Sequence, residues 1–204
     1  MEQRKGIVIV IVLALSLIVV ASSFVFLNFG LYRSETVANQ QVTSASTSEP
    51  EVELQNIYLH VVRGDPISNE LEKGLKEELQ QSGEVKSFIN LKENFDGPVV
   101  AAKVLRTNIF YTPFYSQAEV DVLFFFSSTG NTTYFQKFVR AEFGGENVPV
   151  IFNSQQGPQL IVKGKINVKD TSYGVFSIKN YHSRLAEEIT SRIDNNVEDI
   201  STKY

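Results

Sequence analysis

Glu119 and Asp121 come closest, among the side chains of this sequence, to a pair that could do acid–base chemistry. They lie two residues apart in an alternating segment, so in a strand both would project from the same face. A glycosidase-like pair needs its carboxylates to face each other across a cleft. Two carboxylates on one strand face are more typical of a solvated surface, and an unrecognised hydrolase is kept only as an alternative function.

The two histidines, His60 and His182, do not form a recognisable site. His60 lies in an apolar strand-like segment, and His182 lies near the start of a helical segment without a metal-ligand partner at suitable spacing. The sequence also lacks a nucleophile elbow, a phosphate-binding loop, a dinucleotide fingerprint and a calcium loop. We therefore predict no catalytic residue, no cofactor, no metal site and a protein that is not an enzyme.

Four aromatic residues surround Pro113 where the chain should turn between strands, namely Phe110, Tyr111, Phe114 and Tyr115. Aromatic side chains at a turn can form an apolar binding surface or contact a membrane. They can also cover the end of the core. These four residues are the candidate binding surface, with core covering as the alternative.

Asn131-Thr132-Thr133 is the only glycosylation sequon of the chain and falls in a predicted exposed turn. Asn131 is therefore a candidate glycosylation site if the chain passes through a compartment with the machinery. The alternative is a sequon that arose by chance.

The composition limits the remaining classes of function. The chain has 204 residues, a net charge of −4 and 43% hydrophobic residues, which predicts a globular domain without a basic surface for nucleic acid. Cysteine is absent, which excludes disulfides, thiolate chemistry and lipid acylation of a cysteine.

Gly6 to Tyr32 is a run of 27 residues without a charge. As a helix it would be roughly 40 Å long, against about 30 Å for a hydrocarbon core. We predict a cytoplasmic stub and transmembrane signal-anchor over residues 1–32, with residues 7–29 in the lipid bilayer of a cell membrane. Arg4 and Lys5 before the segment outnumber Arg33 after it, which predicts a single pass with the C-terminal domain extracytoplasmic.

Two other interpretations of the N-terminus stay open. Ala21-Ser22-Ser23 offers small residues to a signal peptidase, although secretory signals have a shorter apolar region. The start up to Gly6, followed at once by an apolar helix, resembles the leaders of type IV pilin-like proteins. That family usually carries a Glu early in the mature helix, and residues 7–15 hold none.

Residues 33–53 are rich in Ser and Thr, lack aromatic residues and show no sustained apolar period. This composition predicts a flexible linker between the anchor and a domain over residues 54–200, with a tail at 201–204.

The domain pattern is a strand, a helix, several strands and a closing helix. Asp65-Pro66 opens a helix with an apolar stripe over 66–82, and a second stripe starts at Tyr181. Between them we predict strands at 54–63, 85–92, 99–110, 118–126, 133–143 (a hairpin partner), 160–169 and 175–178, with a turn at 170–174. The prediction is an α+β domain: an antiparallel sheet with two amphipathic helices on one face.

The order Ile57–Val62, helix 66–82, Val162–Asp170, Thr171–Gly174 and helix 181–193 resembles small periplasmic α+β modules. The lipopolysaccharide-assembly lipoprotein and the N-terminal domain of the Tol translocation protein are of this kind. The resemblance implies a fold, while the acylated cysteine of the lipoprotein is missing here. We expect a membrane-anchored interaction or assembly module with a protein partner, and a pilin-like filament subunit as the alternative.

Overall fold

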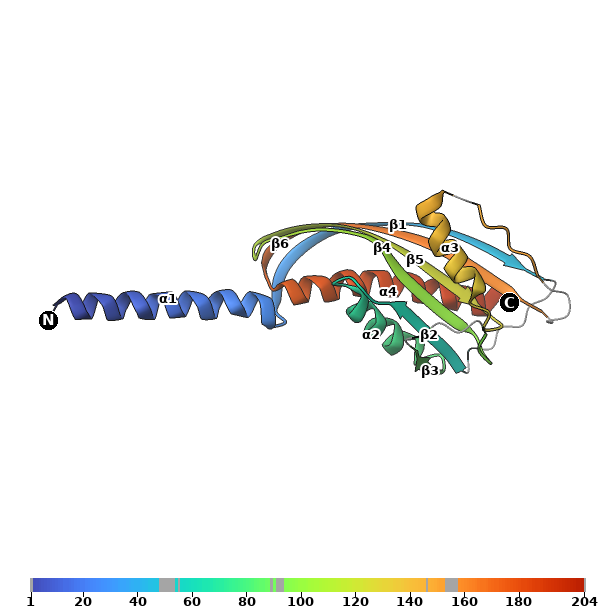
Figure 1. Cartoon of the computed structure of the whole chain (residues 1–204), viewed down its shortest axis with the longest axis horizontal. Helices are drawn as coiled ribbons and strands as arrows, with labels where there is room; N and C mark the ends of the chain where they lie inside the picture. The colour runs from blue at the N-terminus through green and yellow to red at the C-terminus, as the bar shows by residue number, and fades with distance from the viewer. Residues whose placement is uncertain are drawn as a thin grey trace.

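A computed structural model of the chain describes residues 2–47, 54, 56–88, 90, 94–145, 147–152 and 158–203. Helix α1, Glu2–Phe26, projects from one end of a head that contains the other elements (Figure 1). Its window Ile9–Phe26 has a mean hydropathy of 2.9 and is not buried by the rest of the chain. The predicted N-terminal apolar helix, long enough to cross a membrane, is therefore confirmed.

The head is built on a six-stranded sheet in the order β1-β6-β5-β4-β2-β3. The strands are β1 Gly30–Ser46, β2 Asn56–Val62, β3 Glu84–Ser87, β4 Val99–Tyr111, β5 Tyr115–Ser127 and β6 Leu160–Phe176. β1, β6, β5 and β4 pair antiparallel, whereas β2 pairs parallel with both β4 and β3. The α+β class is confirmed, but the sheet is mixed and not purely antiparallel.

Two helices cover one face of the sheet, as predicted. Helix α2, Ser68–Leu79, and helix α4, Ile178–Lys203, pack on each other and on the larger core cluster. The Asp65 carboxylate accepts the N–H groups of Ile67 (2.8 Å) and Ser68 (3.0 Å), which satisfies the start of α2. α4 continues through the predicted tail to Lys203, because Val197 and Ile200 extend its buried stripe.

A third helix, α3 Thr133–Gly144, replaces the hairpin strand predicted at 133–143. Tyr134, Phe135, Phe138 and Ala141 are buried, and this spacing is helical. They pack with Leu123 and Phe125 in a second core cluster on the face opposite α2 and α4. α3 covers only the part of that face distant from α1 (Figure 1).

The predicted linker is wrong over its first two thirds. Gly30–Ser46 pairs with Leu160–Phe176 over 17 consecutive residues as an edge strand. The strand begins inside the predicted anchor, so the boundary at residue 32 is wrong as well. Residues 48–53 lie outside the described residues.

Strand β6 contradicts a second local prediction. The expected turn at 170–174 and strand at 175–178 are parts of one strand that runs through to Phe176. Gly164 lies in the middle of β6, where the Phe124 ring occupies the space that a β-carbon at this position would need. The strand predicted at 85–92 ends at Ser87, and part of that range is not described.

Candidate functional site

The predicted aromatic surface lies on the β4–β5 hairpin, at the end of the head that faces α1 (Figure 1). Thr112 closes the turn: its N–H donates to the Tyr115 carbonyl (2.8 Å), and its hydroxyl accepts the Tyr115 N–H (2.9 Å). Phe110 and Phe114 are exposed, and Tyr115 is half-buried against Tyr173, with 5.1 Å between the ring centroids.

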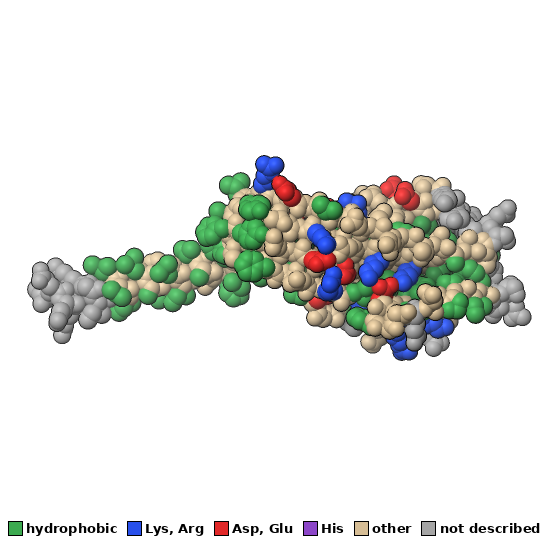
Figure 2. Space-filling model, turned by 90° about the horizontal axis from the view of Figure 1, so that it is seen from above, with side chains coloured by type: hydrophobic (Ala, Val, Ile, Leu, Met, Phe, Trp, Pro, Cys, Tyr) green, Lys and Arg blue, Asp and Glu red, His purple; other side chains and the backbone are tan. Residues whose placement is uncertain are grey.

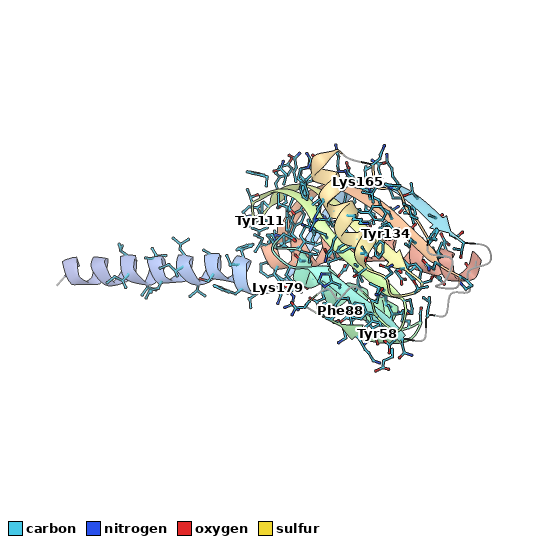
Figure 3. All side chains as sticks on the ribbon, turned by 45° about the vertical axis from the view of Figure 1, so that its right-hand side comes forward. Tyr58, Phe88, Tyr111, Tyr134, Lys165 and Lys179 are labelled. Carbon is cyan, nitrogen blue, oxygen red and sulfur yellow. The ribbon has the colours of Figure 1, made fainter. Side chains whose placement is uncertain are left out.

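Tyr111 does not belong to this surface. Its hydroxyl donates to the Phe176 carbonyl (2.7 Å), and its ring packs on Phe176 and Tyr181 in the core. Burial raises the pKa of the Tyr111 hydroxyl, in agreement with its inward position (Figure 3). The structure therefore keeps three of the four predicted residues at the surface and assigns the core-covering alternative to the fourth.

The hairpin lies beside the end of α1. Phe24 of α1 contacts both Phe29 (5.2 Å between centroids) and Phe114 (6.4 Å). The Ser177 N–H donates to the Phe29 carbonyl (2.9 Å), and the Asn180 amide donates to Asn28 (3.0 Å). These contacts join α1 to the head directly.

Exposed apolar side chains surround this junction and come from four segments: the end of α1, the start of β1, the hairpin and the end of β6. Leu31 is 83% exposed, Phe26 76% and Phe114 64%. Figure 2 shows apolar side chains grouped where the helix meets the head. We call this group the collar; it consists of Phe26, Leu27, Leu31, Phe110, Phe114, Tyr173 and Val175.

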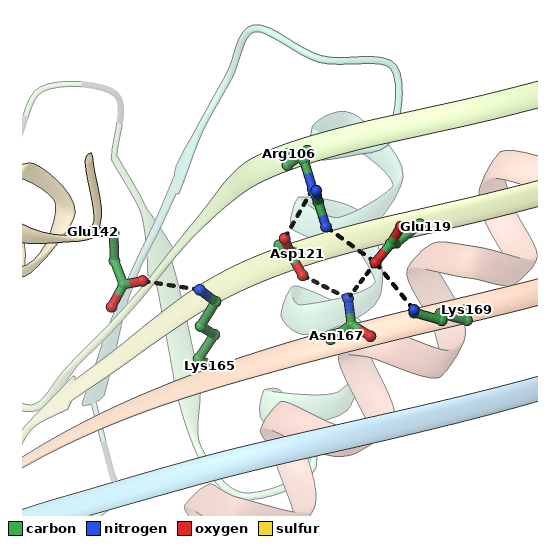
Figure 4. Close-up of polar contacts among 7 residues, drawn as sticks. All are labelled: Arg106, Glu119, Asp121, Glu142, Lys165, Asn167 and Lys169. Atoms are coloured by element: carbon green, nitrogen blue, oxygen red, sulfur yellow. Dashed lines mark hydrogen bonds and ion pairs between the residues drawn. The ribbon is translucent and has the colours of Figure 1, made fainter. Parts of the chain in front are cut away.

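Glu119 and Asp121 lie on the sheet face that α3 leaves open (Figure 4). Arg106 contacts Glu119 (Nη2–Oε1 3.0 Å) and Asp121 (Nε–Oδ2 3.1 Å). Lys169 adds a second cation at Glu119 (3.4 Å), and the Asn167 amide donates to Asp121 (2.6 Å). Both carboxylates are paired with cations on one strand face, so they do not form a separated pair across a cleft.

The histidines occupy structural positions. His60 is buried, with Nδ1 at 3.1 Å from the Phe88 carbonyl and its ring stacked on Phe88. His182 is half-buried, and burial lowers its pKa. Within the described residues, no cluster of three His, Cys, Asp or Glu side chains could hold a metal ion.

Asn131 precedes α3 and not a hairpin turn. Its side-chain oxygen accepts the Thr133 N–H (3.0 Å), so the sequon starts the helix. Glycosylation at this half-buried asparagine stays a prediction.

Sequence reasoning missed a buried ion pair on the helix-covered face. Arg184 of α4 contacts Asp170 of β6 (Nη2–Oδ2 2.5 Å), and the Asp170 side chain is fully buried. Thr36 of β1 donates to Asp170 (2.7 Å), and Ser172 also donates to it (2.9 Å). Burial alone would raise the pKa of Asp170, but the bonds from Arg184, Thr36 and Ser172 outweigh it and hold the pKa below its ordinary value.

A signal for this pair was present in the sequence. Asp170 has the same strand parity as Val162, Ile166 and Val168, whose side chains face the core. A carboxylate on the core-facing side of a strand lies either at the end of that strand or next to a partner that pairs with its charge.

No protein-family model and no curated protein matches the chain. Solved structures that are similar to it include a PelC dodecamer, a single-substitution variant, from Paraburkholderia phytofirmans, with 14% identity, a TM-score of 0.33, and 74% of this chain and 95% of that chain covered. A minor lipoprotein from Acinetobacter baumannii shares 14% identity at a TM-score of 0.25, with 70% and 94% covered. Similarity at this level assigns neither family nor function to the chain.

Proposed function

We propose that the chain is a membrane-anchored, extracytoplasmic and non-catalytic interaction module that binds an extended segment of a protein partner along the free edge of β1. The observation that carries this proposal is the edge itself. β1 is 17 residues long and pairs only on its β6 side, among the described strands. An unpaired strand edge binds another strand through its main-chain groups.

The register identifies which backbone groups are free. Thr47 N–H donates to the Gln159 carbonyl, and Ser177 N–H donates to the Phe29 carbonyl, so odd positions at both ends of β1 face β6. No register shift interrupts the ladder between them. Even positions of β1, from Tyr32 to Ser46, therefore direct their N–H and C=O groups away from the sheet.

β1 carries few of the features by which proteins usually block a sheet edge, since its two charged residues, Arg33 and Glu35, lie toward the end next to α1. It contains no Lys, no Pro and no bulge, whereas the opposite edge, β3, is only four residues long. The even positions of β1, whose backbone groups point away from the sheet, carry mostly small or polar side chains. This composition limits nonspecific aggregation. The edge is thus long enough and open enough for a partner strand.

Membrane anchoring rests on α1, and the orientation rests on the charge bias of Arg4 and Lys5 over Arg33. The absence of catalysis rests on the paired state of Glu119 and Asp121. The filament alternative gains from the direct junction between α1 and the head, because no flexible linker separates the helix from strand β1. Ile7 as the mature N-terminus would favour the filament subunit.

Gln40 and Gln41 provide a matched test of the edge. The Gln40 N–H points outward and the Gln41 N–H points to β6, while both side chains are exposed. Gln40→Pro removes an outward donor from an edge strand, where Pro is tolerated. Gln41→Pro breaks the ladder and should destabilise the head.

We expect a partner to co-purify with the full chain after cross-linking and purification in detergent. The Gln40→Pro variant should lose this partner, while its thermal stability should equal that of the unmodified chain. Gln40→Ala removes only the side-chain contact with Asn196 and should keep the partner. A Gln40→Pro variant that folds and keeps every partner of the unmodified chain would contradict binding at the edge.

A further inference from the structure

We infer that the collar lies in the head-group region of the bilayer that α1 enters, so that the head is seated on the membrane surface. This inference rests on the proposed anchoring by α1. The partner of the collar is thus a lipid surface, and the free edge of β1 stays available above it.

The first argument is the position of the collar along α1. α1 has 25 residues, and a span of about 20 residues crosses a hydrocarbon core. Counted from the last charged residue before the span, Lys5, that length ends near Phe26. The chain therefore leaves the hydrocarbon where the collar begins, and Phe24 of α1 already contacts Phe114 of the hairpin.

The second argument is a change of polarity along the four long strands. On the open sheet face, Leu31 is level with Val175, and Tyr115 is level with Tyr173. Farther from α1 on the same face, most residues are polar or charged: Glu35 on β1, Gln117 on β5 and Thr171 on β6 lie at one level, and Asn108 on β4 lies one step beyond them. Phe110 and Val37 are the apolar exceptions at these two levels. Exposed apolar side chains therefore gather at the end of the head next to α1 and become fewer along the open sheet face, as expected beside a membrane interface (Figure 2).

The third argument is the placement of cations. Arg33 is exposed and lies opposite Tyr173 in the ladder, directly above Leu31. Lys179 is exposed on the first turn of α4, at the same end of the head (Figure 3). Cations beside an aromatic and aliphatic surface match the phosphates of lipid head groups.

The chain contains no tryptophan, so single Trp variants can report the surroundings of one position each. Phe114→Trp probes the collar, Leu17→Trp probes the middle of α1, and Phe143→Trp probes an equally exposed position on α3 at the far end of the head. The full-length variants are reconstituted into phosphatidylcholine vesicles brominated either near the head group or near the bilayer centre. Tryptophan fluorescence is then compared with that in unbrominated vesicles.

We expect Phe114→Trp to lose fluorescence in vesicles brominated near the head group, Leu17→Trp to lose it with bromine near the centre, and Phe143→Trp to lose none. A quenched Leu17→Trp with an unquenched Phe114→Trp would overturn the seated collar and leave the anchor intact. A blue-shifted but unquenched Phe114→Trp would assign the collar to a protein partner instead, which also overturns it. Loss of quenching at Leu17→Trp would remove the anchor and the proposed function together.

Discussion

Asp170 of β6 joins three elements of the head, because it holds β1 through Thr36 and α4 through Arg184. Arg184 also lies over the rings of Tyr32 (5.3 Å) and Tyr181 (5.5 Å). A fully buried carboxylate leaves an unpaired charge behind when one partner is removed. The pair therefore holds strand β1 to helix α4.

We predict that Asp170→Asn lowers the free energy of unfolding of the head by about 3–5 kcal/mol, since Arg184 loses its counter-ion inside the protein. Chemical denaturation in detergent, followed by circular dichroism, measures this change. Glu119→Gln removes a carboxylate from the open face and serves as the control, with an expected cost of about 0–1 kcal/mol. Equal losses in the two variants would contradict the structural role of the buried pair.

The same carboxylate makes stability depend on pH. The folded pKa of Asp170 lies below its ordinary value of 3.8, so the native state favours the ionised form. Its contribution is complete above the ordinary pKa and is lost as the pH falls through the folded pKa. Acid unfolding curves of the unmodified chain should therefore be steeper in this range than those of Asp170→Asn, and superimposable curves would exclude this linkage.

Residue chemistry was only partly readable from the sequence. The exposed aromatic residues Phe110 and Phe114 followed from residue types and turn signals. Tyr111 and Asp170 required the fold, because burial depends on which face of a strand meets a helix. Because residues Thr171–Gly174 have the composition of a turn, the sequence alone predicts that Asp170 also belongs to that turn.

At the scale of elements, the correct predictions were those for segments with a regular spacing of apolar residues. Strands β4 and β5 and helices α2 and α4 bury regular stripes, and they lie close to the predicted ranges. β1 is an edge strand whose inward residues are only half-buried, so Thr36 and Ala38 suffice where a central strand needs large apolar residues. Its composition could not be distinguished from that of a linker. α3 was missed because a turn signal at Gly130 favoured a hairpin over its helical spacing.

Amide exchange can distinguish strand from linker at β1. We predict slow exchange at odd positions such as Glu35, Val37 and Asn39, whose N–H groups face β6, and fast exchange at the even positions between them. Exchange detected by NMR on the purified chain in detergent reads out each position. Fast exchange throughout residues 33–46 would contradict the strand, and slow exchange at even positions would show that the edge is already occupied.

At the scale of the whole molecule, the contacts of Phe24, Phe29 and Ser177 join helix α1 and the head into one elongated body (Figure 1). The sequence predicted both parts and their order, but it assigned a flexible linker between them. The difference matters for function, because a tethered head samples many orientations, whereas a joined head presents the β1 edge at a fixed height and direction.

We therefore predict a narrow distribution of distances between α1 and the head in membranes. The absence of cysteine allows spin labels at Val20→Cys on α1 and Lys73→Cys on α2, both exposed positions. Double electron–electron resonance in nanodiscs should give a single narrow distance peak, since the junction fixes α1 against α4. A Gly-Ser insertion after Leu27 provides the control, because it separates α1 from the contacts of Phe29 and should broaden the peak without changing the stability of the head. Equally broad distributions with and without the insertion would mean that the junction contacts do not hold the head in the membrane.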